Sequence, residues 1–249
     1  MSADYDALWS GAWKDAAAQG PGFRSRYATL LRLMGEHGAA GRFLEVGAGT
    51  GAFLPAVRAR FPWLEVSGHD ASAVALESLR ARDGLAAVYD GELGPDFALG
   101  RAFDVIVCSE VLEHIEDDGA ALDALVRHLR PGGRLYLSVP QRASLWTQVD
   151  EAVGHVRRYD PGALARMVRE RGLEVLADRS TGFPLYNAYY RVLGRKSPQE
   201  TADTTKKGLR TRALTAALSA LLTAEARVST PLGGRGFVVG RRPIQRGGA

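Results

Sequence analysis

Three glycines at alternate positions follow a short apolar run early in the chain, where residues 42–53 read R-F-L-E-V-G-A-G-T-G-A-F. Gly47, Gly49 and Gly51 remove the side chains that would hold a ligand away from the backbone. The carboxylate of Glu45, two residues earlier, would repel a pyrophosphate but attract an ammonium or sulfonium group. The segment therefore predicts a strand, a glycine turn and a helix that bind a cationic ligand, although its spacing also fits a degenerate dinucleotide-binding pattern.

A second carboxylate, Asp70, closes the next predicted strand, nineteen residues beyond Gly51. In doubly wound sheets ligands bind at the carboxyl ends of the strands. A carboxylate offers two acceptor oxygens, so Asp70 is placed to accept hydrogen bonds from two ribose hydroxyls. The alternative is an acid that only begins the following helix.

Two acids and two histidines later in the chain have spacings that suit proton transfer or metal binding. Glu110, Glu113 and His114 have i, i+3, i+4 spacing, and His155 could add a fourth metal ligand from a later loop. Alternatively, Glu113 and His114 orient their loop by hydrogen bonds and bind no metal. His155 is also the candidate general base, because histidine side chains ordinarily have a pKa near 6.5 and accept protons at neutral pH. A core or capping histidine is the other interpretation.

Basic residues gather in the second half of the chain. Residues 1–153 hold 14 Lys and Arg against 21 Asp and Glu, whereas residues 154–249 hold 18 against 7, so the net charge of +4 combines −7 and +11. Arg157 and Arg158, followed by Tyr159, could hold an anionic substrate or could be exposed charges before the next helix. The basic part as a whole could face an anionic substrate, a membrane surface or nucleic acid, or could be a solvated face.

Alternating strands and helices must position these residues. Strands that alternate with helices predict a parallel sheet covered on both faces. Between the last two expected strands lie about fifty residues outside this pattern, including an apolar helical stretch at 213–226. Strands are expected at 43–46, 64–68, 85–89, 102–108, 133–139, 173–177 and 236–240, and helices at 22–37, 73–82, 120–129 and 161–171.

The length and composition fit one catalytic domain. The chain has 249 residues, of which 46% are hydrophobic and 24% charged. Its single cysteine, Cys108, lies in an apolar run, and the first residues lack the features of a secretory signal, so we expect a cytoplasmic protein. We divide the domain into N-terminal helices (1–40), a cofactor-binding core (41–182), a helical insertion (183–232) and a last strand with its tail (233–249).

The glycine turn resembles the acidic-x-Gly-x-Gly-x-Gly motif of class I S-adenosylmethionine-dependent methyltransferases. Residues 109–114, S-E-V-L-E-H, are similar to a signature of the ubiquinone-type branch of that superfamily, and the resemblance extends over about residues 40–180, with F-D-V-I, L-R-P-G-G-R-L and G-H-V-R-R-Y. It implies an α/β fold, a Rossmann-like doubly wound sheet of seven mostly parallel strands with a terminal antiparallel strand. It also implies S-adenosyl-L-methionine as the cofactor.

The resemblance assigns roles to individual residues. Asp90 matches the position that meets the adenine amino group, although Glu92 is an alternative. In the family the segment after the fourth strand passes beneath the transferring methyl group, so Ser109 and Glu110 should line the cofactor, and Glu110 joins His155 as a candidate catalytic residue. Some relatives hold a divalent ion with a similar Glu-x-x-Glu-His and a distant histidine. The full set expected to bind the cofactor is Glu45, Gly47, Ala48, Gly49, Gly51, Asp70, Ala71, Asp90, Ser109 and Glu110.

The sequence therefore predicts a methyltransferase that moves a methyl group in line to an oxygen of a small-molecule acceptor. Positioning of the acceptor would supply most of the rate, with a base needed only for a poorly ionised acceptor. N-methylation, a non-catalytic protein that binds nucleic acid or a protein partner, and an NAD-dependent dehydrogenase are the alternatives. An anionic or lipid-linked acceptor, a peripheral membrane contact of the basic insertion and the oligomeric state stay open.

Overall fold

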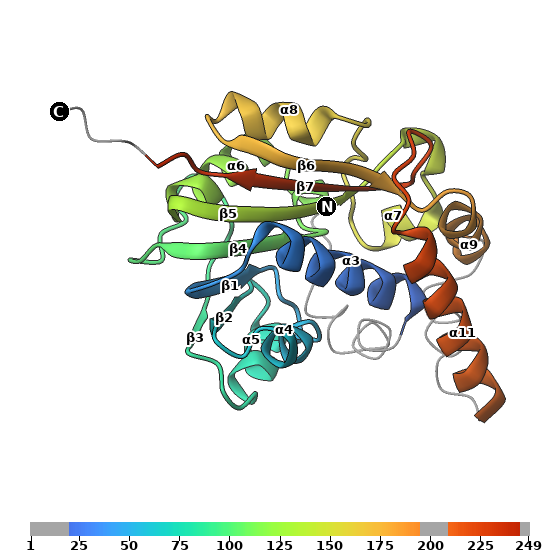
Figure 1. Ribbon diagram of the computed structural model, residues 1–249, viewed down its shortest axis with the longest axis horizontal. Helices are drawn as coiled ribbons and strands as arrows, with labels where there is room; N and C mark the ends of the chain where they lie inside the picture. The colour runs from blue at the N-terminus through green and yellow to red at the C-terminus, as the bar shows by residue number, and fades with distance from the viewer. Residues whose placement is uncertain (1–19, 195–208, 245–249) are drawn as a thin grey trace.

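A single seven-stranded sheet organises the protein. The structure, a computed structural model, describes residues 20–194 and 209–244. Its strands lie in the order β3-β2-β1-β4-β5-β7-β6 (Figure 1). β7 is antiparallel to β5 and β6, and the other neighbouring pairs are parallel, which confirms the predicted fold class. The strands are β1 (Arg42–Val46), β2 (Glu65–His69), β3 (Ala87–Tyr89), β4 (Phe103–Ser109), β5 (Leu129–Pro140), β6 (Glu174–Thr181) and β7 (Arg235–Arg241).

Helices alternate with the strands, as the sequence predicts, with shifts at several ends. The expected helix at 161–171 begins only at Ala163, because Gly162 has a φ of +81° and interrupts the helical turn after Pro161. The helices are α3 (Pro21–His37), α4 (Leu54–Arg60), α5 (Ala73–Arg80), α6 (Asp118–Arg127), α7 (Gln148–Ala152), α8 (Ala163–Glu170), α9 (Leu185–Leu193) and α11 (Leu209–Glu225), with short 3₁₀ turns η1 (Leu112–His114) and η2 (Ala143–Leu145).

The central strands bury apolar side chains on both faces, because helices cover both sides of a parallel sheet. Leu44 and Ile106 belong to one core with α6 and α8, and Phe43 and Val105 belong to a second core with α3 and α4. Successive side chains of a strand point to opposite faces, so residues two positions from Phe43 along β1, and their partners on neighbouring strands, also face α3. Polar residues at such positions form the candidate site.

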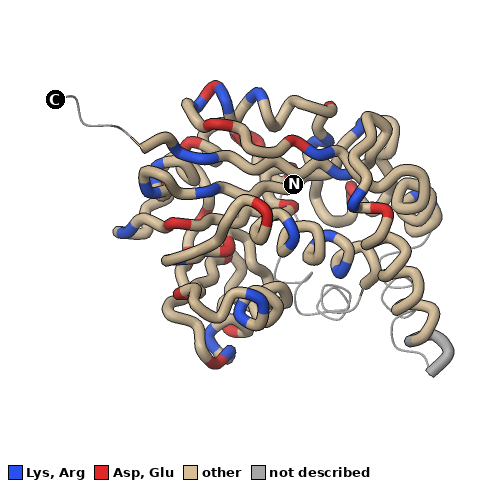
Figure 2. Tube along the Cα trace, in the orientation of Figure 1, with Lys and Arg blue, Asp and Glu red and all other residues tan. Residues whose placement is uncertain are grey.

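The C-terminal helix α11 packs beside α3, where the Ser25 hydroxyl donates a hydrogen bond to the Leu222 carbonyl at 3.1 Å. Residues 213–224 carry no charged side chain, and Figure 2 shows this part of the helix in tan. The basic excess of the second half of the chain is therefore not located on residues 213–224 of α11. Within the described ranges, no helix has the length and apolar character needed to cross a membrane. Tyr5, Trp9 and Trp13, which recur every four residues near the N-terminus and suggest a helical core stripe, lie outside the described residues.

Candidate active site

A row of polar side chains crosses the α3 side of the sheet near its carboxyl edge. Glu45 of β1 is in register with Val107 of β4, so Ser109, two positions later, lies on the same face. Ser109 is directly opposite Ser138 of β5, and their hydroxyl oxygens are 2.8 Å apart. The Ser138 hydroxyl also donates to the Glu110 carboxylate at 3.1 Å. Residues from three neighbouring strands therefore meet at one place.

The glycine turn has the backbone conformation that its sequence predicts. Gly47, Gly49 and Gly51 have φ values of +69°, +55° and +72°, a region that residues with a side chain rarely adopt. A Cβ on Gly47 would lie 2.3 Å from Val111 Cγ2, so this position has no room for one. The neighbouring Ala48 is buried and donates its N–H to the His69 carbonyl at 2.9 Å. The turn thus offers a bare backbone surface at the end of β1.

Asp70 is buried at the end of β2 and connects this strand to the glycine turn. One carboxylate oxygen accepts the Gly49 N–H at 2.7 Å, and the other accepts the Ser72 N–H at 2.9 Å. A carboxylate oxygen has two lone pairs, so accepting one N–H does not by itself prevent it from accepting from a ribose hydroxyl. Ala71, the next residue in the chain, is exposed. Asp90 is also exposed, pairs with Arg80 at 3.6 Å, and follows β3 at the same edge.

The buried carboxylate of Glu45 fits a cationic ligand. Its side chain is 5% exposed, and its Oε2 has no hydrogen-bond partner among the described residues. Burial raises the pKa of Glu45 to about 8, and the charge of Arg26 opposes this rise only in part. An ammonium group bound here would satisfy the free oxygen and favour the ionised form. The turn, Asp70 and Glu45 together fit the methionine and ribose parts of S-adenosylmethionine.

The two glutamates after β4 have opposite electrostatic environments. Glu110 lies 3.6 Å from Arg26, and although burial would raise its pKa, the charges of Arg26, Arg235 and His155 lower it. Glu113 is fully buried, neither of its oxygens has a hydrogen-bond partner among the described residues, and burial and the Glu110 charge raise its pKa well above the usual range. The surroundings therefore favour the ionised form of Glu110 and the protonated form of Glu113.

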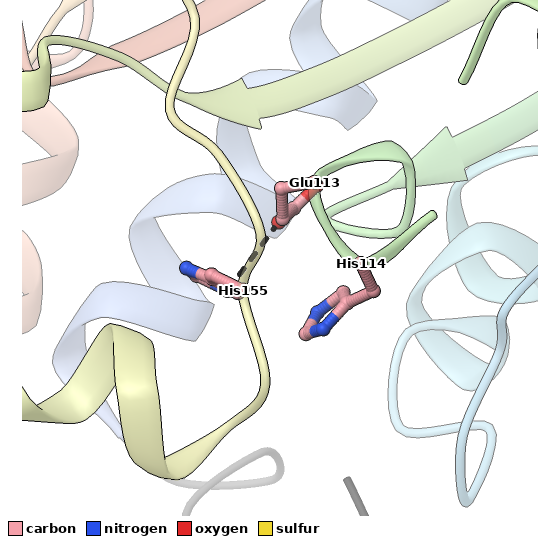
Figure 3. A group of neighbouring side chains, drawn as sticks. All are labelled: Glu113, His114 and His155. Carbon is pink, nitrogen blue, oxygen red and sulfur yellow. Dashed lines mark ion pairs between the residues drawn. The ribbon is translucent and has the colours of Figure 1, made fainter. Parts of the chain in front are cut away.

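His155 is fixed by a buried carboxylate. Its Nδ1 lies 2.7 Å from Asp150 Oδ1, and Asp150 also pairs with the Arg158 guanidinium at 2.9 Å and accepts the Thr147 N–H at 2.8 Å. Burial would raise the pKa of Asp150, but these partners lower it, so the carboxylate accepts and His155 Nδ1 donates. This tautomer leaves a lone pair on Nε2, which lies 3.8 Å from Glu113 Oε1 (Figure 3). The imidazole is thereby oriented to accept a proton.

Three of the four expected metal ligands come together. Ligand atoms of Glu113, His114 and His155 lie within 4.8 Å of one another, and Figure 3 shows the first two on the segment after β4 and His155 on a facing loop. Glu110 is not part of this group and pairs with Arg26 instead. Of the four candidate ligands, these three are therefore close enough to share one ion, and Glu110 lies outside the group.

Neither expectation for Arg158 holds. Its side chain is 2% exposed and binds Asp150, so it is neither an exposed charge nor open to a substrate. Arg157 pairs with Asp118 at 2.8 Å. The sequence reasoning also missed Arg26 and Asp150, although Asp150, on α7, lies only five residues before His155 in the following loop, which was a usable signal.

Comparisons with known proteins agree with this geometry. A family model described as a methyltransferase domain matches residues 22–178. Among curated relatives, the ubiquinone biosynthesis O-methyltransferase of Thiobacillus denitrificans is 30% identical over 173 residues, which cover 62% of this chain and 72% of the relative. That of Aromatoleum aromaticum is 30% identical over 156 residues, which cover 55% and 66%.

Solved structures share the fold. The N-methyltransferase NodS of Bradyrhizobium japonicum, in complex with S-adenosyl-L-homocysteine, is 19% identical with a TM-score of 0.61, and the match covers 96% of this chain and 98% of NodS. A methyltransferase bound to the Haloferax volcanii Trm112 activator is 17% identical with a TM-score of 0.63, and the match covers 98% and 99%. At these identities the likeness concerns the fold alone. The family match and the curated relatives place the chain in the methyltransferase domain family, and the protein is an S-adenosylmethionine-dependent methyltransferase.

Proposed function

We propose that the protein methylates an oxygen atom of a small-molecule acceptor, with His155 as the general base. The bound cofactor supplies an electrophilic methyl group on a sulfonium. The observation that carries the proposal is the 2.7 Å contact between His155 Nδ1 and Asp150, itself held by Arg158. This contact directs the Nε2 lone pair away from Asp150, where it can accept the proton of a hydroxyl. The names of the curated relatives also favour an oxygen acceptor over N-methylation or a non-catalytic role.

The other residues act by position. Glu45 and Asp70 would hold the cofactor's ammonium and ribose groups, and Ser109 and Glu110 would line its methyl end. An acceptor held in line gains most of its rate from this placement.

A divalent ion on Glu113, His114 and His155 is the second candidate arrangement. Its support is the 4.8 Å cluster of ligand atoms. An ion would be coordinated by the Nε2 lone pair of His155 and would favour the ionised form of Glu113. His155 therefore cannot act as a general base and as a metal ligand at the same time. Treatment with EDTA separates them, because it would leave a base mechanism intact and would silence a metal-dependent one until Mg²⁺ or Zn²⁺ is restored.

We further propose an acceptor that carries an anionic or lipid group. Exposed leucines on α11, Leu214 and Leu221, support a contact with lipid, whereas the basic run at 206–212 lies outside the described side chains.

Methyl transfer from radiolabelled S-adenosylmethionine to matched phenols, alcohols and amines tests the acceptor atom. Labelled phenol ethers are expected, and labelled amines alone would contradict the proposal.

A further inference from the structure

Arg235, the first residue of β7, is a buried arginine without a hydrogen-bond or ion-pair partner in the described part of the chain. The residue is 4% exposed, and its Nε is buried with no hydrogen-bond partner among the described residues. No described carboxylate lies within ion-pair distance of it, and its guanidinium carbon lies 4.0 Å from the centre of the Tyr186 ring. An aromatic face stabilises a cation less than a carboxylate does, so the desolvated charge of Arg235 is only partly compensated.

The sheet topology places Arg235 next to the row of polar side chains on the α3 side of the sheet. Because β7 is antiparallel to β5, its first residue lies at the edge where β4 and β5 end. Arg235 is in register with Pro140, two positions beyond Ser138, and therefore lies on the same face as Ser138 and Ser109. In strand order it lies on the far side of these serines from Glu45. Glu45 and the glycine turn that follows β1 occupy the opposite end of the row.

Two carboxylates on the elements around Arg235 already have other partners. Helix α3 contributes Arg26, whose guanidinium pairs with Glu110 at 3.6 Å. Glu225, which approaches from α11, accepts the backbone N–H groups of Leu185 and Tyr186 instead of pairing with a cation. A ligand carboxylate would supply the ion-pair partner that no described residue gives Arg235.

We propose that Arg235 binds a carboxylate carried by the methyl acceptor. The proposal rests on the proposed function and narrows its substrate class to hydroxylated carboxylic acids, with hydroxybenzoates as an example. A guanidinium binds a carboxylate through two parallel hydrogen bonds, and the Tyr186 ring holds the guanidinium from one side. The cofactor's own carboxylate has the same chemistry, but the place of Arg235 beyond Ser138, away from the glycine turn, favours the acceptor.

Binding of benzoate and of benzyl alcohol, which differ in charge but little in shape, tests the proposal without turnover. Calorimetry or ligand-observed NMR is performed on full-length protein saturated with S-adenosylhomocysteine. The wild type should bind benzoate at least about tenfold more tightly than benzyl alcohol, the scale of a charged hydrogen bond. Arg235→Gln should lose this preference and keep its S-adenosylhomocysteine affinity, and Arg235→Lys should retain part of it. Arg241→Gln, at the exposed other end of β7, is the matched control.

Two results would overturn the proposal. Equal binding of the two probes by the wild type is the first, and it needs no variant that folds. The second is an Arg235→Gln protein that keeps the benzoate preference, or one that loses S-adenosylhomocysteine affinity in the same proportion, which would assign Arg235 to the cofactor. A preference for benzoate with no labelled phenol product would instead contradict the proposed oxygen acceptor and leave the carboxylate site standing.

Discussion

The glycine-turn end and the Arg235 end of the polar row are built in opposite ways. At the first, the main groups lie close together in the chain, between Glu45 and Asp70, and the Gly49 N–H donates to the Asp70 carboxylate. At the second, side chains come from α3, the segment after β4, the loop that holds His155 and the start of β7. Several of these side chains are buried and charged. Among the described residues, no hydrogen bond or ion pair joins the glycine turn to His155 or Arg235, so we expect cofactor affinity and acceptor chemistry to respond to different substitutions.

The largest effect is expected at the turn. Gly49→Val should abolish S-adenosylhomocysteine binding, because valine disfavours the φ of +55° and its side chain would fill the space where the cofactor meets the backbone. Gly172→Val is the control, since Gly172 also has a positive φ, +74°, and a Cβ there would meet no other atom within 4 Å. Undiminished affinity in a folded Gly49→Val protein would refute the cofactor assignment.

At the Arg235 end, we expect the buried ion pair of Asp150 and Arg158, next to His155, to contribute strongly to the free energy of unfolding. Asp150→Ala leaves the Arg158 guanidinium buried and unpaired, so the free energy of unfolding should fall by about 3–5 kcal/mol. Urea denaturation measures it. The exposed pair of Glu174 with Arg241 provides the comparison, where Glu174→Ala should cost less than about 1 kcal/mol. Similar losses in the two variants would show that the buried pair has no special weight.

A smaller change is expected from the ribose contact. Asp70→Ala should weaken S-adenosylhomocysteine binding by about 1.5–3 kcal/mol, the range for hydrogen bonds to a charged group. Calorimetry at one pH is sufficient. An affinity change within experimental error would mean that Asp70 serves only the Gly49 and Ser72 backbone.

A further effect concerns Glu45 and depends on pH. The folded protein keeps the Glu45 proton up to about pH 8, whereas the unfolded chain loses it near pH 4.5, so this residue destabilises the fold increasingly as pH rises between those values. Without cofactor, the free energy of unfolding of Glu45→Gln relative to the wild type should therefore rise with pH by up to about 1.4 kcal/mol per pH unit, from little difference near pH 4.5. A difference independent of pH would contradict a buried carboxylate with a raised pKa.

The sequence predicted the parts of the molecule that depend on local patterns. Apolar runs with intervening helices are sufficient to predict the sheet, and the glycine turn carries its conformation within five residues. The proximity of Glu113, His114 and His155 was also predicted, because the ends of β4 and β5 must meet at the same edge.

The parts that were missed depend on partners distant in sequence. Arg26 interrupts an otherwise amphipathic helix, and nothing near it indicates that Glu110 is its partner. Arg235 precedes an expected strand as one basic residue among many in the second half of the chain. Arg158 was interpreted from its charge alone, although Asp150, its buried ion-pair partner, lies only eight residues earlier. Which charged residues pair in the core depends on how the helices and strands pack, and the spacing of residues in one sequence does not show it.

The division of labour between the two ends is tested most directly by His155→Ala. S-adenosylhomocysteine affinity and single-turnover methyl transfer to a phenol that the wild type methylates are measured on the same sample. We expect an affinity within about twofold of the wild type, turnover lower by about 10²–10⁴-fold, and recovery with a more acidic phenol that is already ionised. Full activity of His155→Ala, or affinity that falls in step with turnover, would contradict this division.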